Sequence, residues 1–266
     1  MRLYPNCKVN IGLHITGKRH DGYHTLDTIF YPIYNLSDIL DIDLAPTLSF
    51  SCDGIAVDCN SDDNLVMRCY RLMQQRYPQI GPVAIRLTKR IPFGAGLGGG
   101  SSDAAHTALA LNRLFNLGLS REQLAAEVEP LGADCPFFIY NVPCHATGTG
   151  EILTPVEDEW NHLYIVLVKP DIAISTREAY AGIDSLGNLI FRPGFNDFEL
   201  SVFPQHPRLE LIKQTLLDHG AVYASLSGSG ATVFGLFTSP ITDINSLFAD
   251  CFVCATTLSP QPHAAV

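Results

Sequence analysis

The pattern of apolar and polar positions in the first half of the chain predicts strands that lead into helices. Residues 7–16 alternate between apolar and polar side chains, with Lys8 and Asn10 on the polar side, as in a strand with one buried face. A solvated face is the ordinary interpretation of Lys8 and Asn10, and the floor of a binding site fits equally well. Ser61 or Asp62 is expected to cap a helix. Further strands are predicted at 25–30, 36–43, 48–52 and 83–91.

The last of these strands delivers residues 92–105, which read PFGAGLGGGSSDAA. Glycine lacks a Cβ, so it accepts positive φ and lets the backbone approach a ligand closely. Ser101, Ser102 and Asp103 are N-cap types followed by apolar residues at helical spacing, so a helix is predicted to begin near Ser101. A helix N-terminus offers unpaired N–H donors, which together with the glycines predicts a phosphate cradle. A flexible linker is disfavoured, because linkers seldom run straight into a patterned helix.

Three better-known nucleotide motifs do not fit this stretch. The spacing Gly94-x-Gly96-x-x-Gly99 matches G-x-G-x-x-G, but a dinucleotide fold needs a second parallel strand with an acidic residue roughly 20 positions on. Here a second helix follows instead, opened by a capping box of Ser120 and Gln123. A Walker loop needs a lysine that is missing, and the protein-kinase motifs are not found.

Two further segments carry candidate chemistry. Asp134 lies between a predicted helix and a predicted apolar strand in GADCPFF, where a turn aspartate is the common interpretation and a general base is the chemical one. In DGYH, a turn accounts for Asp21 and Gly22, but it does not account for the two rings that follow. Tyr23 and His24 either pack at a strand edge or stack on a base and bind its edge.

The second half predicts a mostly antiparallel α+β layer, because its strands and helices lack strict βαβ alternation. Ser175 and Glu178 are predicted to form a capping box at a helix start. The turn SGSGA at 227–231 has a hairpin interpretation. Strands are predicted at 163–168, 222–226, 232–237 and 251–256, and helices at 207–219 and 241–249.

Composition restricts the function classes. The chain has 266 residues, 47% of them hydrophobic and 17% charged, and a net charge of −10. This balance suits a globular protein and speaks against nucleic acid or an anionic membrane as a partner. No apolar run approaches ~18 residues, and the start MRLYPNCKVNIGL does not resemble a signal peptide, so we expect a cytoplasmic protein. The eight cysteines are expected to be reduced, and zinc or redox chemistry at Cys251 and Cys254 is disfavoured because a second pair is lacking.

Four segments in order resemble the GHMP kinases, named for galactokinase, homoserine kinase, mevalonate kinase and phosphomevalonate kinase. They are CKVN from residue 7, DGYH from residue 21, the glycine stretch and GADCPFF from residue 132. The resemblance implies that Lys8 and Asp134 are catalytic and that Asn10 contacts the substrate. It also implies that ATP is bound by Pro92, Phe93, Gly94, Ala95, Gly96, Leu97, Gly98, Gly99, Gly100, Ser101 and Ser102.

The same resemblance implies a substrate with a base. In the branch of the family with DGYH, these residues hold a cytosine, so Tyr23 and His24 are expected to bind it, with Tyr180 facing Tyr23 across the base. Thr176 and Gly228 are carried over as further substrate-binding residues. The expected reaction is ATP-dependent, with Mg²⁺, on the 2-hydroxyl of a cytidyl diphosphate derivative of methylerythritol. The metal ligands stay unassigned.

The family fold implied is α+β with two domains. The expected N-terminal domain, residues 1–155, is a ribosomal-protein-S5-domain-2-like α/β domain that ends after a structural turn at 148–151. The expected C-terminal domain, residues 156–266, is ferredoxin-like α+β. The alternatives are another GHMP kinase acting on mevalonate, homoserine or a sugar, and a non-catalytic nucleotide-binding protein on this scaffold. We expect a monomer or a weak homodimer.

Overall fold

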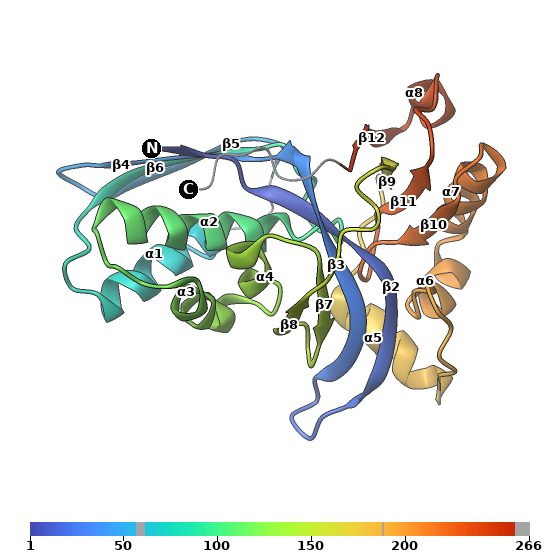
Figure 1. Ribbon diagram of the computed structural model, residues 1–266, viewed down its shortest axis with the longest axis horizontal. Coiled ribbons are helices and arrows are strands. Elements are labelled where there is room, and N and C mark those ends of the chain that lie inside the picture. The colour runs from blue at the N-terminus through green and yellow to red at the C-terminus, as the bar shows by residue number, and fades with distance from the viewer. Residues whose placement is uncertain (57–61, 188, 259–266) are drawn as a thin grey trace.

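The computed structural model describes residues 1–56, 62–187 and 189–258 (Figure 1). Three four-stranded sheets have the strand orders β1-β4-β6-β5, β2-β3-β7-β8 and β10-β11-β9-β12. In Figure 1, helices α1 to α4 gather beneath the first sheet, and the long β2–β3 hairpin separates them from the C-terminal elements. This is the α+β arrangement expected from the sequence.

The strands are β1 (Arg2–Leu3), β2 (Asn6–Lys18), β3 (His24–Ser37), β4 (Ile39–Leu44), β5 (Ser49–Gly54), β6 (Val83–Lys89), β7 (Cys144–Thr147), β8 (Ile152–Pro155), β9 (Tyr164–Pro170), β10 (Tyr223–Leu226), β11 (Val233–Phe237) and β12 (Cys251–Thr257). The helices are α1 (Leu65–Arg76), α2 (Gly99–Leu114), α3 (Arg121–Val128), the 3-10 turn η1 (Glu129–Leu131), α4 (Cys135–Tyr140), α5 (Thr176–Leu186), α6 (Glu199–Gln205), α7 (Pro207–Asp218) and α8 (Ile244–Leu247). Within the described ranges, no helix combines the length and apolar character needed to cross a bilayer.

Strand β2 is buried on both faces around Lys8 and Asn10, so of the two interpretations of these residues the solvated face is wrong. Lys8 is 4% exposed and Asn10 is 1% exposed. The polar side is covered because the glycine stretch and the turn at 227–230 pack over it: the backbone N–H of Lys8 donates to Leu97 O at 2.9 Å. A β-bulge between Ile11 and Leu13 then changes the register of the strand.

Several element boundaries differ from the predicted ones. Helix α1 is capped by Asn64, whose side chain accepts from the N–H of Val66; Asp62 is not the cap, and Ser61 lies outside the described residues. Helix α2 begins at Gly99, not near Ser101, because Gly98 ends the loop in the left-handed conformation. The segment after Asp134 is the short helix α4, not a strand.

The C-terminal sheet is wholly antiparallel, as predicted. The capping box predicted at the start of α5 is wrong, since Ser175 occupies the N-cap position without a side-chain hydrogen bond. The predicted helix at 241–249 is reduced to the short α8. Helix α6, which contains Pro204, was not predicted.

The β2–β3 hairpin ties the two halves of the chain together. Leu13 exchanges backbone hydrogen bonds with Phe195 and Asp197 at 2.9 and 2.8 Å. The buried side chains of Leu13 and Ile15 share a core with residues of α5 to α8 and of the C-terminal sheet. Phe30 of β3 belongs to a second core, formed with residues of α1, α2 and α4. The hairpin therefore contributes to a core in each half of the chain, and a boundary at residues 155 and 156 stays a prediction.

Candidate active site

Two adjoining cavities share Gly96 and Gly98 as wall residues. The larger, about 620 Å³, lies between the β2–β3 hairpin and helix α5 and is called the substrate cavity below. The smaller, about 380 Å³, follows the glycine stretch and is called the nucleotide cavity. A group bound in one cavity can therefore reach the other across these two glycines.

The glycine stretch requires glycine at the shared positions. Gly96 and Gly98 have φ of 74° and 70°, which side chains rarely adopt. A Cβ on Gly96 would lie 2.1 Å from Ser227 O, and one on Gly98 would lie 3.0 Å from ring carbons of Phe138. Neighbouring segments thus pack directly against the backbone of the stretch and fix its position. The stretch continues without a break into the start of α2.

The C-terminal half contributes to this loop through the turn at 227–230. Ser227 Oγ donates to Gly96 O at 2.9 Å, and the N–H of Thr232 donates to Ala95 O at 3.1 Å. The turn at 227–230 therefore packs on the glycine stretch itself, with Gly228 lining the substrate cavity.

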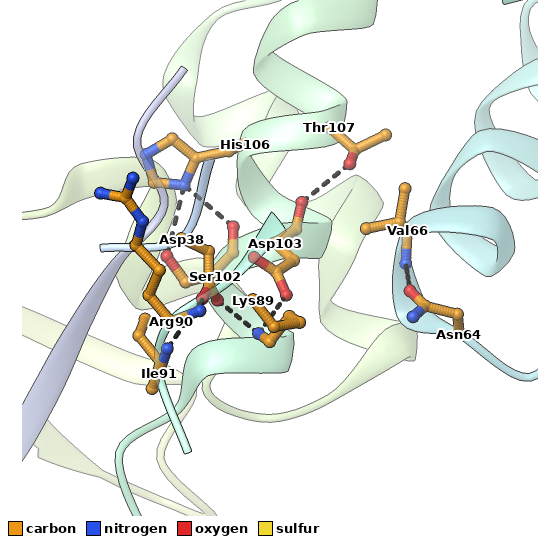
Figure 2. A network of polar contacts seen from close by, with 10 residues as sticks. All are labelled: Asp38, Asn64, Val66, Lys89, Arg90, Ile91, Ser102, Asp103, His106 and Thr107. Carbon is orange, nitrogen blue, oxygen red and sulfur yellow. Dashed lines mark hydrogen bonds and ion pairs between the residues drawn. The ribbon is translucent and has the colours of Figure 1, made fainter. Parts of the chain in front are cut away.

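A buried charge network fixes both ends of the glycine stretch (Figure 2). Asp38 Oδ1 accepts from the N–H groups of Arg90 and Ile91 at 2.5 and 2.9 Å. The ammonium group of Lys89 pairs with Asp38 and, at 2.7 Å, with Asp103 Oδ2 in helix α2. The network joins the end of β6 to the second turn of α2, so the loop between them has little freedom.

Two carboxyl groups face one ammonium in this network, and burial acts on the pKa of Asp103 and of Lys89. Burial raises the pKa of Asp103 well above its usual range despite the opposing effect of Lys89, and Oδ1 of Asp103 is buried without a partner among the described residues. Burial alone would lower the pKa of Lys89, but Asp103 and Asp38 outweigh it and raise that pKa. The ammonium of Lys89 is therefore held between two buried carboxyl groups.

Lys8 and Asp134 lie together in the substrate cavity, and Lys8 packs beside Gly98, which both cavities share. Lys8 Nζ is 3.3 Å from Asp134 Oδ2 and donates to Asn10 Oδ1 at 2.7 Å. The same ammonium lies 4.7 Å from the centre of the Phe30 ring. Asn10, expected to contact a substrate, lines the substrate cavity and also orients Lys8.

The other predicted substrate-binding residues all line the substrate cavity: Tyr23, His24, Thr176, Tyr180 and Gly228. Tyr23 is 67% exposed, whereas His24 is buried. The ring of Tyr180 stacks on His24, with centroids 4.6 Å apart and 13° between the planes, and burial raises the pKa of Tyr180 to about 12. A base held between Tyr23 and Tyr180 stays a prediction.

The structure also adds residues that carried no sequence motif. Lys18 and Asp184 line the substrate cavity, while Asn64, Arg68 and Lys89 line the nucleotide cavity. The ion pairs of Lys18 with Asp184 and of Lys89 with Asp38 join positions far apart in sequence, so no local pattern could identify these residues.

The predicted ATP-binding residues largely share one surface. Every residue from Pro92 to Ser101 lines the nucleotide cavity. Ser102, in contrast, is fully buried, with its hydroxyl 3.4 Å from His106 Nδ1. The described part of the chain holds no group of three or more His, Cys, Asp or Glu side chains placed for a metal ion. Cys251 and Cys254 are free thiols in strand β12.

Comparisons with known proteins agree with this architecture. The family model of the GHMP kinases N terminal domain matches residues 64–141, and that of the GHMP kinases C terminal matches residues 179–244. The chain is 46% identical to 4-diphosphocytidyl-2-C-methyl-D-erythritol kinase of Parabacteroides distasonis, over 97% of this chain and 100% of that one. It is also 46% identical to the Bacteroides fragilis protein of the same name, over 95% and 98%.

A solved structure resembles the whole chain as well. The crystal structure of 4-(cytidine 5'-diphospho)-2C-methyl-D-erythritol kinase superposes with a TM-score of 0.82 at 31% identity, covering 97% of this chain and 98% of that one. Sequence and fold thus agree over nearly the full length. The chain belongs to the GHMP kinases and, within them, to the 4-diphosphocytidyl-2-C-methyl-D-erythritol kinase family.

Proposed function

We propose that this chain transfers the γ-phosphoryl group of ATP to the 2-hydroxyl of 4-diphosphocytidyl-2-C-methyl-D-erythritol, giving ADP and the 2-phosphate. This reaction belongs to the non-mevalonate route to isoprenoid precursors. Relatives named for this kinase activity, which match 97% of this chain, support the proposal. The structural observation that carries it is the Lys8–Asp134 pair in the substrate cavity, with Lys8 packed beside Gly98, which both cavities share.

The nucleotide cavity suits the triphosphate of ATP. Backbone N–H groups from Gly94 to Gly100 and the N-terminus of α2 favour negative charge without a protein cation having to enter the loop. Phosphoryl transfer depends on positioning and charge stabilisation more than on covalent chemistry. A loop fixed at both ends by Asp38 and Lys89 supplies that positioning before the nucleotide binds.

Asp134 is the proposed general base. Its carboxylate lines the substrate cavity and would accept the proton of the acceptor hydroxyl as it attacks. Lys8, held by Asn10, would orient that carboxylate and stabilise charge that develops during transfer. The cytosine would be bound by Tyr23, with His24 and Tyr180 beside it, as DGYH implies.

Mg²⁺ is the proposed metal, and it supplies neutralisation of the phosphate charge. The described residues offer no cluster of three acidic or other ligating side chains, which fits an ion that keeps several waters and binds mainly to phosphates. Ser101, which lines the nucleotide cavity, would hold the ion together with the phosphates. Removing Mg²⁺ with a chelator should abolish transfer and restoring it should recover transfer; unchanged activity would contradict this part of the proposal.

The decisive experiment measures ADP release with ATP and three acceptors in parallel: the cytidyl substrate, mevalonate and homoserine. We expect turnover with the cytidyl substrate alone. Turnover with mevalonate or homoserine instead would favour another GHMP activity, and nucleotide binding without turnover would favour a non-catalytic protein. The cytoplasmic location and the monomeric or weakly dimeric state stay predictions.

A further inference from the structure

Asp184 joins helix α5 to the base-binding residue His24 at the start of β3. Its Oδ1 lies 2.7 Å from His24 Nε2, and its Oδ2 accepts from Lys18 Nζ at 2.5 Å. All three residues line the substrate cavity. No motif in the sequence singles out Asp184, and the contact spans 160 positions.

The imidazole of His24 is therefore fixed in two ways. Its edge is held by Asp184, and its face is stacked on Tyr180 with centroids 4.6 Å apart. The ring is also buried, with 8% of the residue exposed. A ring held at an edge and a face presents its remaining nitrogen, Nδ1, in a defined direction.

Asp184 also decides which ring nitrogen carries the proton. Hydrogen bonds from Lys18 and His24 lower the pKa of the Asp184 carboxyl, so it is ionised at neutral pH. An ionised carboxylate only accepts hydrogen bonds, so Nε2 must carry the proton of this bond, and in a ring that holds only that proton Nδ1 is an acceptor. No hydrogen bond joins Nδ1 to the described residues, which leaves it available to a ligand.

We infer that Asp184 is a positioning residue that sets His24 as a hydrogen-bond acceptor for the amino group of the substrate's base. Cytosine carries an amino donor where uracil carries a carbonyl acceptor. The Asp184–His24 pair would thereby favour cytidyl over uridyl substrates. This inference rests on the proposed function, because it assumes that the base binds beside His24.

The test compares Asp184→Ala with wild type for the cytidyl substrate and for its uridyl analogue. Asp184 is well exposed, with 40% of its side chain accessible, so the variant should fold. We expect the cytidyl KM to rise roughly 5- to 100-fold, the range for one lost base-edge contact, and the preference over the uridyl analogue to shrink. The KM for ATP should not change. In Asp184→Asn, whose amide oxygen can still accept from Nε2, the cytidyl KM should rise less than in Asp184→Ala.

A second readout needs no substrate. Nitrogen NMR of the His24 ring should show the proton on Nε2 in wild type and a mixture of tautomers in Asp184→Ala. Asp27→Ala is the matched control, because Asp27 pairs with His145 Nε2 at 3.1 Å outside both cavities; it should leave both KM values unchanged.

Unchanged cytidyl KM and base preference in Asp184→Ala would overturn the inference, as would a wild-type ring protonated on Nδ1. A wild type that does not phosphorylate the cytidyl substrate would instead contradict the proposed function. The two failures are distinguishable, since the tautomer is measured without turnover.

Discussion

The ammonium group of Lys8 lies 3.3 Å from Asp134 Oδ2, although one residue belongs to a buried strand and the other precedes helix α4. Asp134 occupies the N-cap position of that helix, yet its side chain makes no capping hydrogen bond. The structural interpretation of a turn or cap aspartate is therefore not supported by its contacts. The carboxylate instead faces the substrate cavity beside a cation.

Asp134→Ala should slow turnover by roughly 10²- to 10⁴-fold, the usual loss for a removed general base. Steady-state rates with saturating ATP and cytidyl substrate measure this loss directly. Asp250→Ala is the control, since Asp250 forms an exposed ion pair with Arg208 and lines neither cavity. Rates near the wild-type value for Asp134→Ala would remove this residue from the mechanism.

Tyr23→Ala should weaken binding of the cytidyl substrate by about 1–3 kcal/mol, the usual range for a base stacked on an aromatic ring. ATP binding should be nearly unchanged, because Tyr23 lines the substrate cavity and not the nucleotide cavity. Titration calorimetry with each ligand separates the two effects. Tyr4→Ala is the matched control, as Tyr4 is also exposed but lies outside both cavities. An equal fall in ATP affinity would assign Tyr23 a structural role.

The sequence predicted the features that depend on contacts between residues close together in the chain. The capping box of Ser120 and Gln123 forms as expected, and the glycine stretch follows a strand and leads into a helix. Residues Pro92 to Ser101 line one cavity because consecutive residues of a tight loop share a surface. These features depend on neighbours within a few positions, so the sequence contains most of the information.

Long-range partners explain the features that the sequence did not reveal. Asp103 resembles an N-cap residue, but it lies inside α2 because Lys89 neutralises it there. Phe137 and Phe138 resemble a buried strand because the short helix α4 is covered by other elements and shows no polar face. The role of Asp184 follows from its contact with His24, and no helical or strand spacing in the sequence connects the two residues.

Gly96→Ala should disable the site, whereas Gly118→Ala should not. Both glycines have nearly the same φ, 74° and 72°, so both variants carry the strain of a left-handed side-chain residue, about 1–2 kcal/mol. A Cβ at Gly96 would also lie 2.1 Å from Ser227 O, whereas one at Gly118 meets no atom within 4 Å. Displacement of the loop should lower kcat/KM for ATP on the order of 10²-fold.

Kinetics and thermal unfolding of the two glycine variants separate strain from displacement. A kinetic defect confined to Gly96→Ala, with a larger loss of stability than in Gly118→Ala, would support the contact with Ser227 as the cause. Wild-type kinetics in Gly96→Ala would show that the loop tolerates the extra carbon and is not held as tightly as the contacts indicate.

His106 should make the protein less stable in acid. It lies in α2, donates from Nδ1 to Ser102 O at 2.9 Å, and burial lowers its pKa from 6.5 to about 4. Between these values the unfolded chain binds a proton that the folded chain does not, so stability falls as pH decreases from 6.5 toward 4. At pH 5 this single group should lower the free energy of unfolding by about 2 kcal/mol relative to pH 8.

Urea unfolding at pH 8 and pH 5 measures this contribution when wild type is compared with His106→Asn, whose amide can still donate to Ser102 O. The variant should lose about 2 kcal/mol less than wild type over this interval. His219→Asn is the matched control, because His219 makes the same kind of bond to Thr215 O at 2.7 Å but is exposed. Burial, and not the hydrogen bond, lowers the pKa of His106. The stability of the control should therefore depend on pH as that of wild type does. Equal pH dependence in wild type and His106→Asn would mean that the imidazole is charged, or solvated, within the folded protein.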